Sequence, residues 1–287
     1  MTADSLTGEL PDGVRLGAVT LSVADAERSM TFYRDLVGLR ELSRAGSLVT
    51  LGAGANPVLH LAETAGAQPA PARSSGLYHT AILFPDRAAL ARVVRHIAQN
   101  DYAFSGASDH LVSEAFYLDD PDGHGVELYR DRPSTDWPRR GDTIEMASLP
   151  LDVPDLLREA TRDFDGAPEG TCIGHVHLKV HDLAQAEAFY TNVVGFAVTA
   201  RYGDSATFLA AGGYHHHLGA NIWQSRGAPP VPDGHVRLRE IIIEVPGPAD
   251  VDGFAQRAER AGVAVTRDGA RITARDPWNH SIAVTTG

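Results

Sequence analysis

The sequence repeats itself, and this repeat limits the possible folds more than any other feature of the chain. Residues 16–25 (LGAVTLSVAD) return as residues 173–182 (IGHVHLKVHD), and each copy is followed at the same distance by a Phe-Tyr pair and a Val-Gly pair. The two copies lie 157 residues apart throughout. A second, weaker pair of similar segments covers residues 77–127 and 239–283. Such internal similarity predicts a fold that is built from repeated supersecondary units.

Each repeated segment has the same order of local patterns. Alternating apolar residues come first, a helical pattern follows, and short apolar runs separated by Gly-rich turns end the segment. Alternation with a period of two predicts strands, and apolar spacings of three and four predict an amphipathic helix. The sequence therefore predicts an α+β fold with four βαβββ units. We expect units one and two to form a first domain over residues 14–133, a Pro-rich linker over residues 134–172, and units three and four to form a second domain over residues 173–286.

Composition limits the kind of partner and the kind of metal site. The net charge of −12 argues against a nucleic-acid or anionic membrane surface. No apolar run reaches the roughly 18 residues of a membrane span, and the first residues lack the pattern of a signal peptide, so we expect a soluble, cytoplasmic protein. Cys172 is the single cysteine, which excludes an intramolecular disulfide and a Cys-based cluster. Any metal ion therefore needs histidine and carboxylate ligands.

The segment from His110 to Glu127 places three reactive side chains around one turn. Residues 120–123 (DPDG) are a turn sequence, so the strand that ends at Tyr117 and the strand that carries Glu127 are expected to pair as a hairpin. Alternation then directs Glu127 to the face opposite its apolar neighbours Val126 and Leu128. A lone inward carboxylate is costly to bury unless it is paired or bound to a metal ion.

On these repeats and this segment, the chain resembles the vicinal oxygen chelate superfamily, which contains glyoxalases, bleomycin resistance proteins and dioxygenases. Residues 110–127 resemble the signature of type I extradiol ring-cleaving dioxygenases of the catechol 2,3-dioxygenase kind. The resemblance implies two vicinal oxygen chelate domains, in which paired βαβββ units form half-open mixed β-sheet barrels. It also implies that metal ligands come from the first and last strands of the units.

The ligand positions can be carried over from unit to unit. Those of the first strands are Ala18, His79, His175 and Glu240, and those of the last strands are His60, Glu127, Asn221 and Ala283. The resemblance implies that His79, His175 and Glu127 form a 2-His-1-carboxylate triad for Fe(II), with Mn(II) as the alternative ion. Units one and four would then form a barrel without a metal ion, in which Glu240 is paired to a cation or faces solvent.

This triad requires units two and three to share a barrel, although they lie in different halves of the chain. Pairing within each half would instead combine His60 with His79 and Glu127. We favour the arrangement across the halves, because the His-rich segment 213–221 of unit three is expected beside an extradiol iron.

The resemblance also implies roles for the neighbouring residues. His217 is the expected acid–base residue with His215 beside it, and His110 and Tyr117 are expected to hydrogen-bond the oxygens of the substrate. Other histidines and aromatic residues receive structural roles, namely His177 on an outward or mixed face, His181, Tyr129, Phe208 and Trp223.

The implied activity is the insertion of both atoms of O₂ into a catechol-type aromatic diol, which gives a semialdehyde acid. The expected partners are the small-molecule diol, O₂ and further copies of the chain in a homo-oligomer, with no nucleic acid and no membrane. Three alternatives stay open within the same superfamily: a metal-dependent glyoxalase-like lyase or thiol transferase, a hydroquinone-cleaving dioxygenase, and a binding protein without a metal ion.

Overall fold

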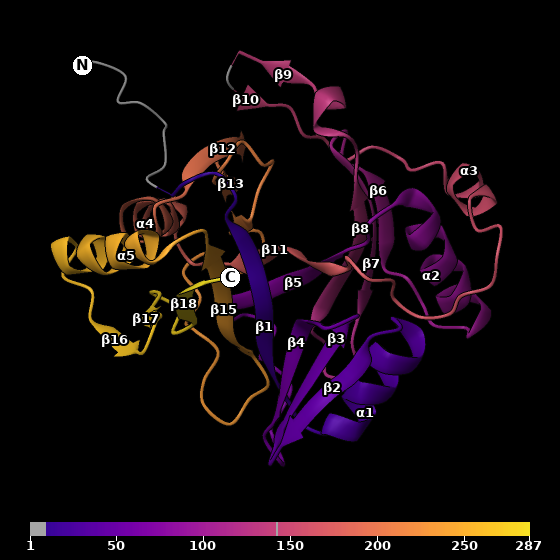
Figure 1. The fold of residues 1–287 in the computed structure, drawn as a ribbon, viewed down its shortest axis with the longest axis horizontal. Coiled ribbons are helices and arrows are strands. Elements are labelled where there is room, and N and C mark those ends of the chain that lie inside the picture. The colour runs from indigo at the N-terminus through magenta and orange to yellow at the C-terminus, as the bar shows by residue number, and fades with distance from the viewer. Residues whose placement is uncertain (1–9, 142) are drawn as a thin grey trace.

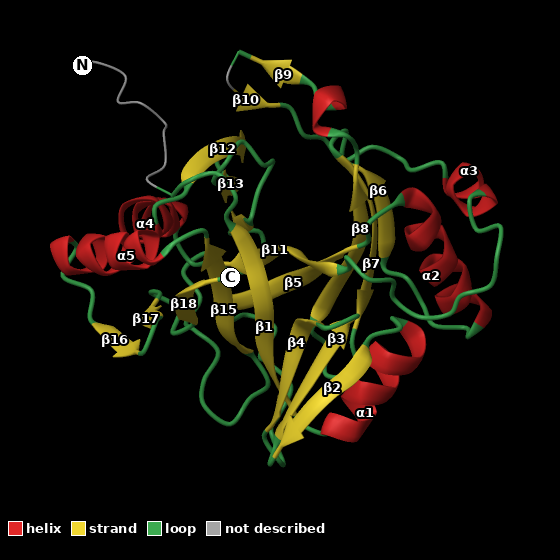
Figure 2. Ribbon diagram, viewed as in Figure 1, coloured by secondary structure: helices red, strands yellow, loops and turns green. Residues whose placement is uncertain are grey.

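The computed structural model describes residues 10–141 and 143–287, which form two mixed eight-stranded sheets and one short two-stranded sheet (Figures 1 and 2). In spatial order, the first sheet contains β16 (Val265–Asp268), β17 (Arg271–Arg275), β18 (Ser281–Thr286), β15 (Leu238–Val245), β1 (Arg15–Val23), β4 (Asn56–Glu63), β3 (Leu48–Ala53) and β2 (Arg40–Ala45). The second sheet contains β12 (Ala197–Tyr202), β13 (Ala206–Ala210), β14 (Leu218–Asn221), β11 (Cys172–Lys179), β5 (Gly76–Leu83), β8 (Gly125–Asp131), β7 (Ser113–Asp119) and β6 (Gly106–Asp109). The predicted α+β fold with four βαβββ units is confirmed.

Each sheet combines one unit from each half of the chain. In the first sheet β1 of unit one pairs antiparallel with β15 of unit four, and in the second sheet β5 of unit two pairs antiparallel with β11 of unit three. Within every unit the first strand runs parallel to the last strand. The pairing across the halves is therefore the one that forms, and the ranges 14–133 and 173–286 delimit the halves of the sequence, not the two sheets.

In units one to three, the helix begins at an aspartate that follows the first strand. Asp25, Asp86 and Asp182 cap α1 (Ala26–Met30), α2 (Arg87–Gln99) and α4 (Leu183–Phe189), and each carboxylate accepts a hydrogen bond from the backbone N–H three residues later. In unit four Gly247 takes this position before α5 (Pro248–Arg260). The repeated Phe-Tyr pairs lie at or beside π-helical turns, over Thr31–Leu36 and Tyr190–Val194.

In each half of the chain, one buried tyrosine–aspartate hydrogen bond joins the two units. Tyr33 of unit one donates to Asp120 of unit two at 3.1 Å, and Tyr190 of unit three donates to Asp276 of unit four at 2.8 Å. The second oxygen of Asp120 accepts the backbone N–H groups of residues 122 and 124, which fixes the turn that the sequence predicts at residues 120–123. The sheets join the halves and the Tyr–Asp bonds join the units inside each half, so the four units form a closed cycle.

The linker between the halves packs over the second sheet. It contains a 3₁₀ turn (Ser134–Asp136), β9 (Arg139–Arg140), β10 (Thr143–Ile144) and α3 (Val153–Arg158). Helix α3 lies against α2 (Figure 1), and it starts at Val153 because Asp152 caps it and Pro154 fits its first turn. No helix in residues 10–141 and 143–287 is long and apolar enough to cross a lipid bilayer.

The Tyr33–Asp120 bond predicts a measurable loss of stability. Tyr33→Phe leaves one oxygen of the buried Asp120 carboxylate without its hydroxyl donor, and we expect the free energy of unfolding in urea to fall by about 1–3 kcal/mol. Tyr202→Phe is the control, because this tyrosine is 60% exposed, and a change within about 0.5 kcal/mol is expected there. Equal effects of the two substitutions would contradict the role given to the bond.

Candidate metal centre and cavity

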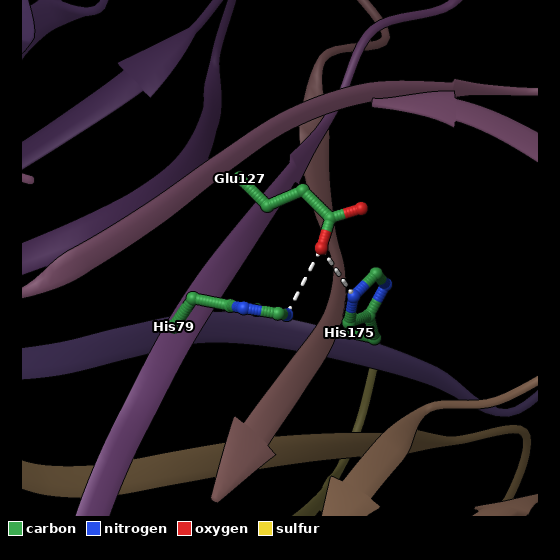
Figure 3. A group of neighbouring side chains, drawn as sticks. All are labelled: His79, Glu127 and His175. Atoms are coloured by element: carbon green, nitrogen blue, oxygen red, sulfur yellow. Dashed lines mark hydrogen bonds and ion pairs between the residues drawn. The ribbon is translucent and has the colours of Figure 1, made fainter. Parts of the chain in front are cut away.

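Three side chains predicted from the sequence converge on one point of the second sheet. His79 on β5, Glu127 on β8 and His175 on β11 come from three adjacent strands. Oε2 of Glu127 lies 2.9 Å from Nε2 of His79 and 3.1 Å from Nε2 of His175 (Figure 3). The ligand atoms of the three residues all lie within 4.8 Å of one another, and the residues are 6%, 2% and 2% exposed, respectively. We call these three residues the triad.

Two features of the triad suit a divalent metal ion: buried nitrogen atoms without hydrogen-bond partners, and the types of its donor atoms. Nε2 of His79 is close to the carboxylate but outside hydrogen-bonding geometry, and this atom and Nδ1 of His175 are buried without a hydrogen-bond partner. A buried polar atom without a partner costs about 1–3 kcal/mol. Two imidazoles and one carboxylate are the donor set of metal sites that leave further coordination positions open for substrates.

Electrostatics keeps Glu127 and His175 in the forms that bind metal ions. Burial raises the pKa of Glu127, but the adjacent His175 and His79 lower it more, and the resulting pKa lies well below its ordinary value. Burial lowers the pKa of His175, and Glu127 offsets only part of this effect. At neutral pH, Glu127 is therefore ionised and His175 is neutral.

The same three positions recur in the first sheet without metal ligands. By the repeat and the strand register, His175 corresponds to Ala18, His79 to Glu240 and Glu127 to Ala283. Glu240 forms an ion pair with Arg271, as we expected for a carboxylate in this position. His60 lies in this sheet as well, 3.0 Å from the hydroxyl of Thr50, so the alternative site with His60 does not form. Within the described part of the chain, the triad is the one group of three or more His, Cys, Asp or Glu side chains that are close enough together to hold a metal ion.

The triad lines a cavity of about 1190 Å³ that also contains the predicted pair His110 and Tyr117. Tyr117 lies opposite Glu127 on the paired strands β7 and β8, which confirms the predicted hairpin. Nδ1 of His110 donates a hydrogen bond to the carbonyl of Ala147 in the linker at 2.6 Å. A neutral imidazole that donates through Nδ1 accepts at Nε2, so the Tyr117 hydroxyl donates to Nε2 of His110, also at 2.6 Å. Burial raises the pKa of Tyr117 well above its ordinary value, so its hydroxyl keeps its proton.

The His-rich segment is arranged differently from our expectation. His216 lines the cavity, and its ring centroid lies 4.1 Å from that of His175. His217 instead stacks on Phe196, and burial lowers its pKa to about 4. The strand β14 begins only at Leu218, so residues 215–217 lie outside a regular strand and their side chains do not follow strand alternation. The structure thus places His216, and not His217, on the cavity wall.

A chain of hydrogen bonds holds His216 from behind. Nε2 of His215 lies 2.8 Å from the carboxylate of Asp131, and Nδ1 of His215 lies 2.7 Å from Nδ1 of His216. An ionised carboxylate only accepts, so His215 donates through Nε2 and a neutral ring then accepts at Nδ1. Burial lowers the pKa of His216 well below its ordinary value, so its ring is neutral, with the proton on Nδ1 and none on Nε2.

Sequence reasoning missed Asp131, although a signal for it exists. Asp131 follows Glu127 and Tyr129 at intervals of two residues on β8, so alternation places all three on one face. It also accepts a hydrogen bond from Tyr214 at 2.8 Å, and Tyr214 lies 2.9 Å from the hydroxyl of Tyr129. Tyr129 therefore packs as expected, and it also belongs to this network behind the cavity.

An aromatic wall on one side of the cavity was also missed. We define it as Tyr78, His177 and Trp223, whose ring centroids lie 5.2–5.7 Å apart. His177 faces the cavity because it lies two residues after His175 on the same strand, so its expected outward or mixed face was wrong. Trp223 and Phe208, which we assigned to packing, line the cavity too.

Comparisons with known proteins place the chain among relatives of stated function. The sequence profile of the Glyoxalase/Bleomycin resistance protein/Dioxygenase superfamily matches residues 15–128 and 172–284. A catechol-2,3-dioxygenase of Bacillus subtilis (strain 168) is 40% identical over 271 residues, which are 93% of this chain and 95% of the relative.

Solved structures share the fold at low sequence identity. A putative dioxygenase from Bacillus subtilis superimposes with a TM-score of 0.65 at 14% identity, over 96% of this chain and 86% of the other. Glyoxalase I from Zea mays superimposes with a TM-score of 0.59 at 16% identity, over 96% of this chain and 93% of the other.

The geometry of the triad predicts a loss of metal binding on substitution. His79→Ala, Glu127→Ala and His175→Ala should each lose tightly bound metal, because two ligands hold an ion much more weakly than three, whereas the parent should bind about one ion per chain. His60→Ala is the control and should keep the parent's metal content. Elemental analysis after purification and dialysis measures these contents. Full metal content in the His175 variant, or two tightly bound ions in the parent, would contradict this site.

Proposed function

The chain belongs to the Glyoxalase/Bleomycin resistance protein/Dioxygenase superfamily, and we propose that it is an extradiol dioxygenase within this superfamily. In this proposal it inserts both atoms of O₂ into a catechol-type diol at a non-haem Fe(II) centre, and a semialdehyde acid is the product. The observation that carries the proposal is the triad in one cavity with His216, His110 and Tyr117. The similarity to a catechol-2,3-dioxygenase over almost the whole chain supports it.

The triad holds the metal ion in this proposal. His79, Glu127 and His175 are its ligands, and their placement on three neighbouring strands makes the site rigid. A bound Fe(II) would supply Lewis acidity and a template for the diol and O₂. Mn(II) fits the same three donors and is the alternative ion.

His216 moves the proton of the substrate in this proposal. Its unprotonated Nε2 accepts a proton from one hydroxyl of the diol, a task that we first assigned to His217. Asp131, through His215, fixes the tautomer of His216 that makes this possible, and its negative charge stabilises the protonated form that results.

His110 and Tyr117 orient the diol. The linker carbonyl of Ala147 fixes the ring of His110, and His110 in turn fixes the hydroxyl of Tyr117 next to the triad. A hydroxyl group in a defined place selects which of the carbon–carbon bonds of the ring is presented for cleavage. The linker is therefore part of the site, because it supplies both this carbonyl and residues 143–148 of the cavity wall.

A direct assay tests the proposed reaction. The protein is purified without oxygen, loaded with Fe(II) or Mn(II) in parallel, and mixed with catechol, substituted catechols and hydroquinones. We expect O₂ uptake together with a yellow ring-fission product from catechols. Cleavage of hydroquinones alone would replace the proposed substrate, and glyoxalase-like turnover of a thiol adduct without O₂ uptake would overturn the reaction.

His216 and His217 can be separated by paired substitutions. His216→Phe should keep the metal content but lower kcat for catechol by about 10²- to 10⁴-fold, which is the usual contribution of a general acid–base residue. His217→Phe is the matched control, because its ring stacks on Phe196 away from the cavity, and we expect its kcat to stay near that of the parent. Metal analysis and steady-state kinetics distinguish the two. The reverse order of effects would return the acid–base role to His217.

A further inference from the structure

Lys179 lies on the same face of β11 as the metal ligand His175. Alternation along the strand directs His175, His177 and Lys179 to one side, and all three line the cavity. The pairing of β11 with β14 is regular from Val176 to Lys179, so this alternation holds to the end of the strand. With a rise of about 3.3 Å per residue, the backbone of Lys179 lies about 13 Å from that of His175. The cavity thus has a second polar end, away from the triad.

Lys179 differs from the other cations of the cavity because it lacks a partner. Arg140 pairs with Glu145 and Arg201 pairs with Glu187, each at 2.8 Å. Within the described part of the chain, Lys179 makes no ion pair or side-chain hydrogen bond, although it lines the cavity. Burial lowers the pKa of Lys179, and no neighbouring carboxylate raises it. A partly buried ammonium group without a counter-ion is an unfavourable arrangement that an anionic ligand would relieve.

The aromatic wall connects this lysine to the triad. Strand β5 is irregular at Tyr78. His177 pairs with His79 and Leu178 pairs with Leu77, so Tyr78 is an extra residue between two paired positions. Both Tyr78 and His79 therefore line the cavity. Trp223 is 47% exposed, which is a large apolar surface at a cavity wall. The volume of about 1190 Å³ exceeds the roughly 300–1,000 Å³ of most small-molecule pockets, so a diol with a single unsubstituted ring leaves most of it empty.

We propose that Lys179 binds an anionic group of the substrate, so that the preferred substrate is an aromatic diol with a side chain that ends in a carboxylate. The diol lies at the triad, the side chain runs over the aromatic wall, and the carboxylate pairs with the ammonium group of Lys179. This inference rests on the proposed diol dioxygenase function and adds the chemical class of the substrate. It makes Lys179 a specificity-determining residue that does not touch the reacting carbons.

Matched catechols test the inference. The Fe(II)-loaded protein is assayed with catechols whose side chain at ring position 4 has one length and ends in a carboxylate, its methyl ester or an amine. We expect the parent to prefer the acid over the ester in kcat/KM by about 10- to 100-fold, the range that one charge-assisted contact supplies. Lys179→Met should bring the ratio of acid to ester close to one and should raise kcat/KM for the amine. Arg201→Met is the control, because Arg201 also lines the cavity but is paired, and it should keep the parent's ratio.

A binding measurement without oxygen supplies a second readout. Calorimetric titration of the Fe(II)-loaded protein with the acid and the ester, under nitrogen, should show the same preference in Kd for the parent and its loss in Lys179→Met. Equal use of acid and ester by the parent, or a preference that survives in Lys179→Met, would overturn the inference and leave the diol dioxygenase function intact. If no diol in the series is cleaved or bound, the proposed function fails, and this inference fails with it.

Discussion

The antiparallel pairing of β5 with β11 is the constraint on which the site depends. It joins the first strands of units two and three and brings His79 and His175 into one sheet, although they are far apart in the sequence. Parallel pairing of β8 with β5 then adds Glu127 on the next strand. On the face of β11 that points away from the cavity, Val176 and Leu178 belong to the continuous apolar core. This core also contains residues of β1. The same burial that stabilises the fold therefore fixes the positions of the metal ligands.

The first sheet shows which residues this fold carries at the three positions when they are not two histidines and a glutamate. Two of its three corresponding positions are alanines, which are buried at no electrostatic cost, and the third is Glu240, whose charge is offset by Arg271. The second sheet instead keeps buried imidazole atoms without partners. Polar atoms of this kind lower stability and are retained where a ligand satisfies them. The two sheets thus share a topology, but within the described residues only the second brings two histidines and a glutamate close enough together to hold a metal ion.

The sequence predicted the units and the hairpin of Glu127, because each depends on local patterns that the internal repeat reinforces. The residues of the triad followed from the resemblance to the superfamily. The pairing across the halves depends on contacts between distant strands, and only the His-rich segment favoured it. Side-chain direction failed where the backbone departs from regular strands. His216 precedes the start of β14, and Tyr78 is an extra residue in β5, so regular strand alternation predicts the direction of neither side chain. Asp131 could have been predicted, because alternation along β8 places it on the same face as Glu127.

The charges at the two ends of the cavity are balanced differently. In the proposed function, the two positive charges of a bound Fe(II) are offset by Glu127 and by the ionised oxygen of the diol. The proton that leaves the diol makes His216 positive, and Asp131 offsets this charge through His215. The reacting end is then neutral as a whole, which suits a buried site where an unbalanced charge is costly. Arg140 and Arg201 are balanced by their own carboxylates. Of the Arg and Lys side chains that line the cavity, only that of Lys179 makes no ion pair with a described residue, and the proposed carboxylate of the substrate supplies its counter-charge.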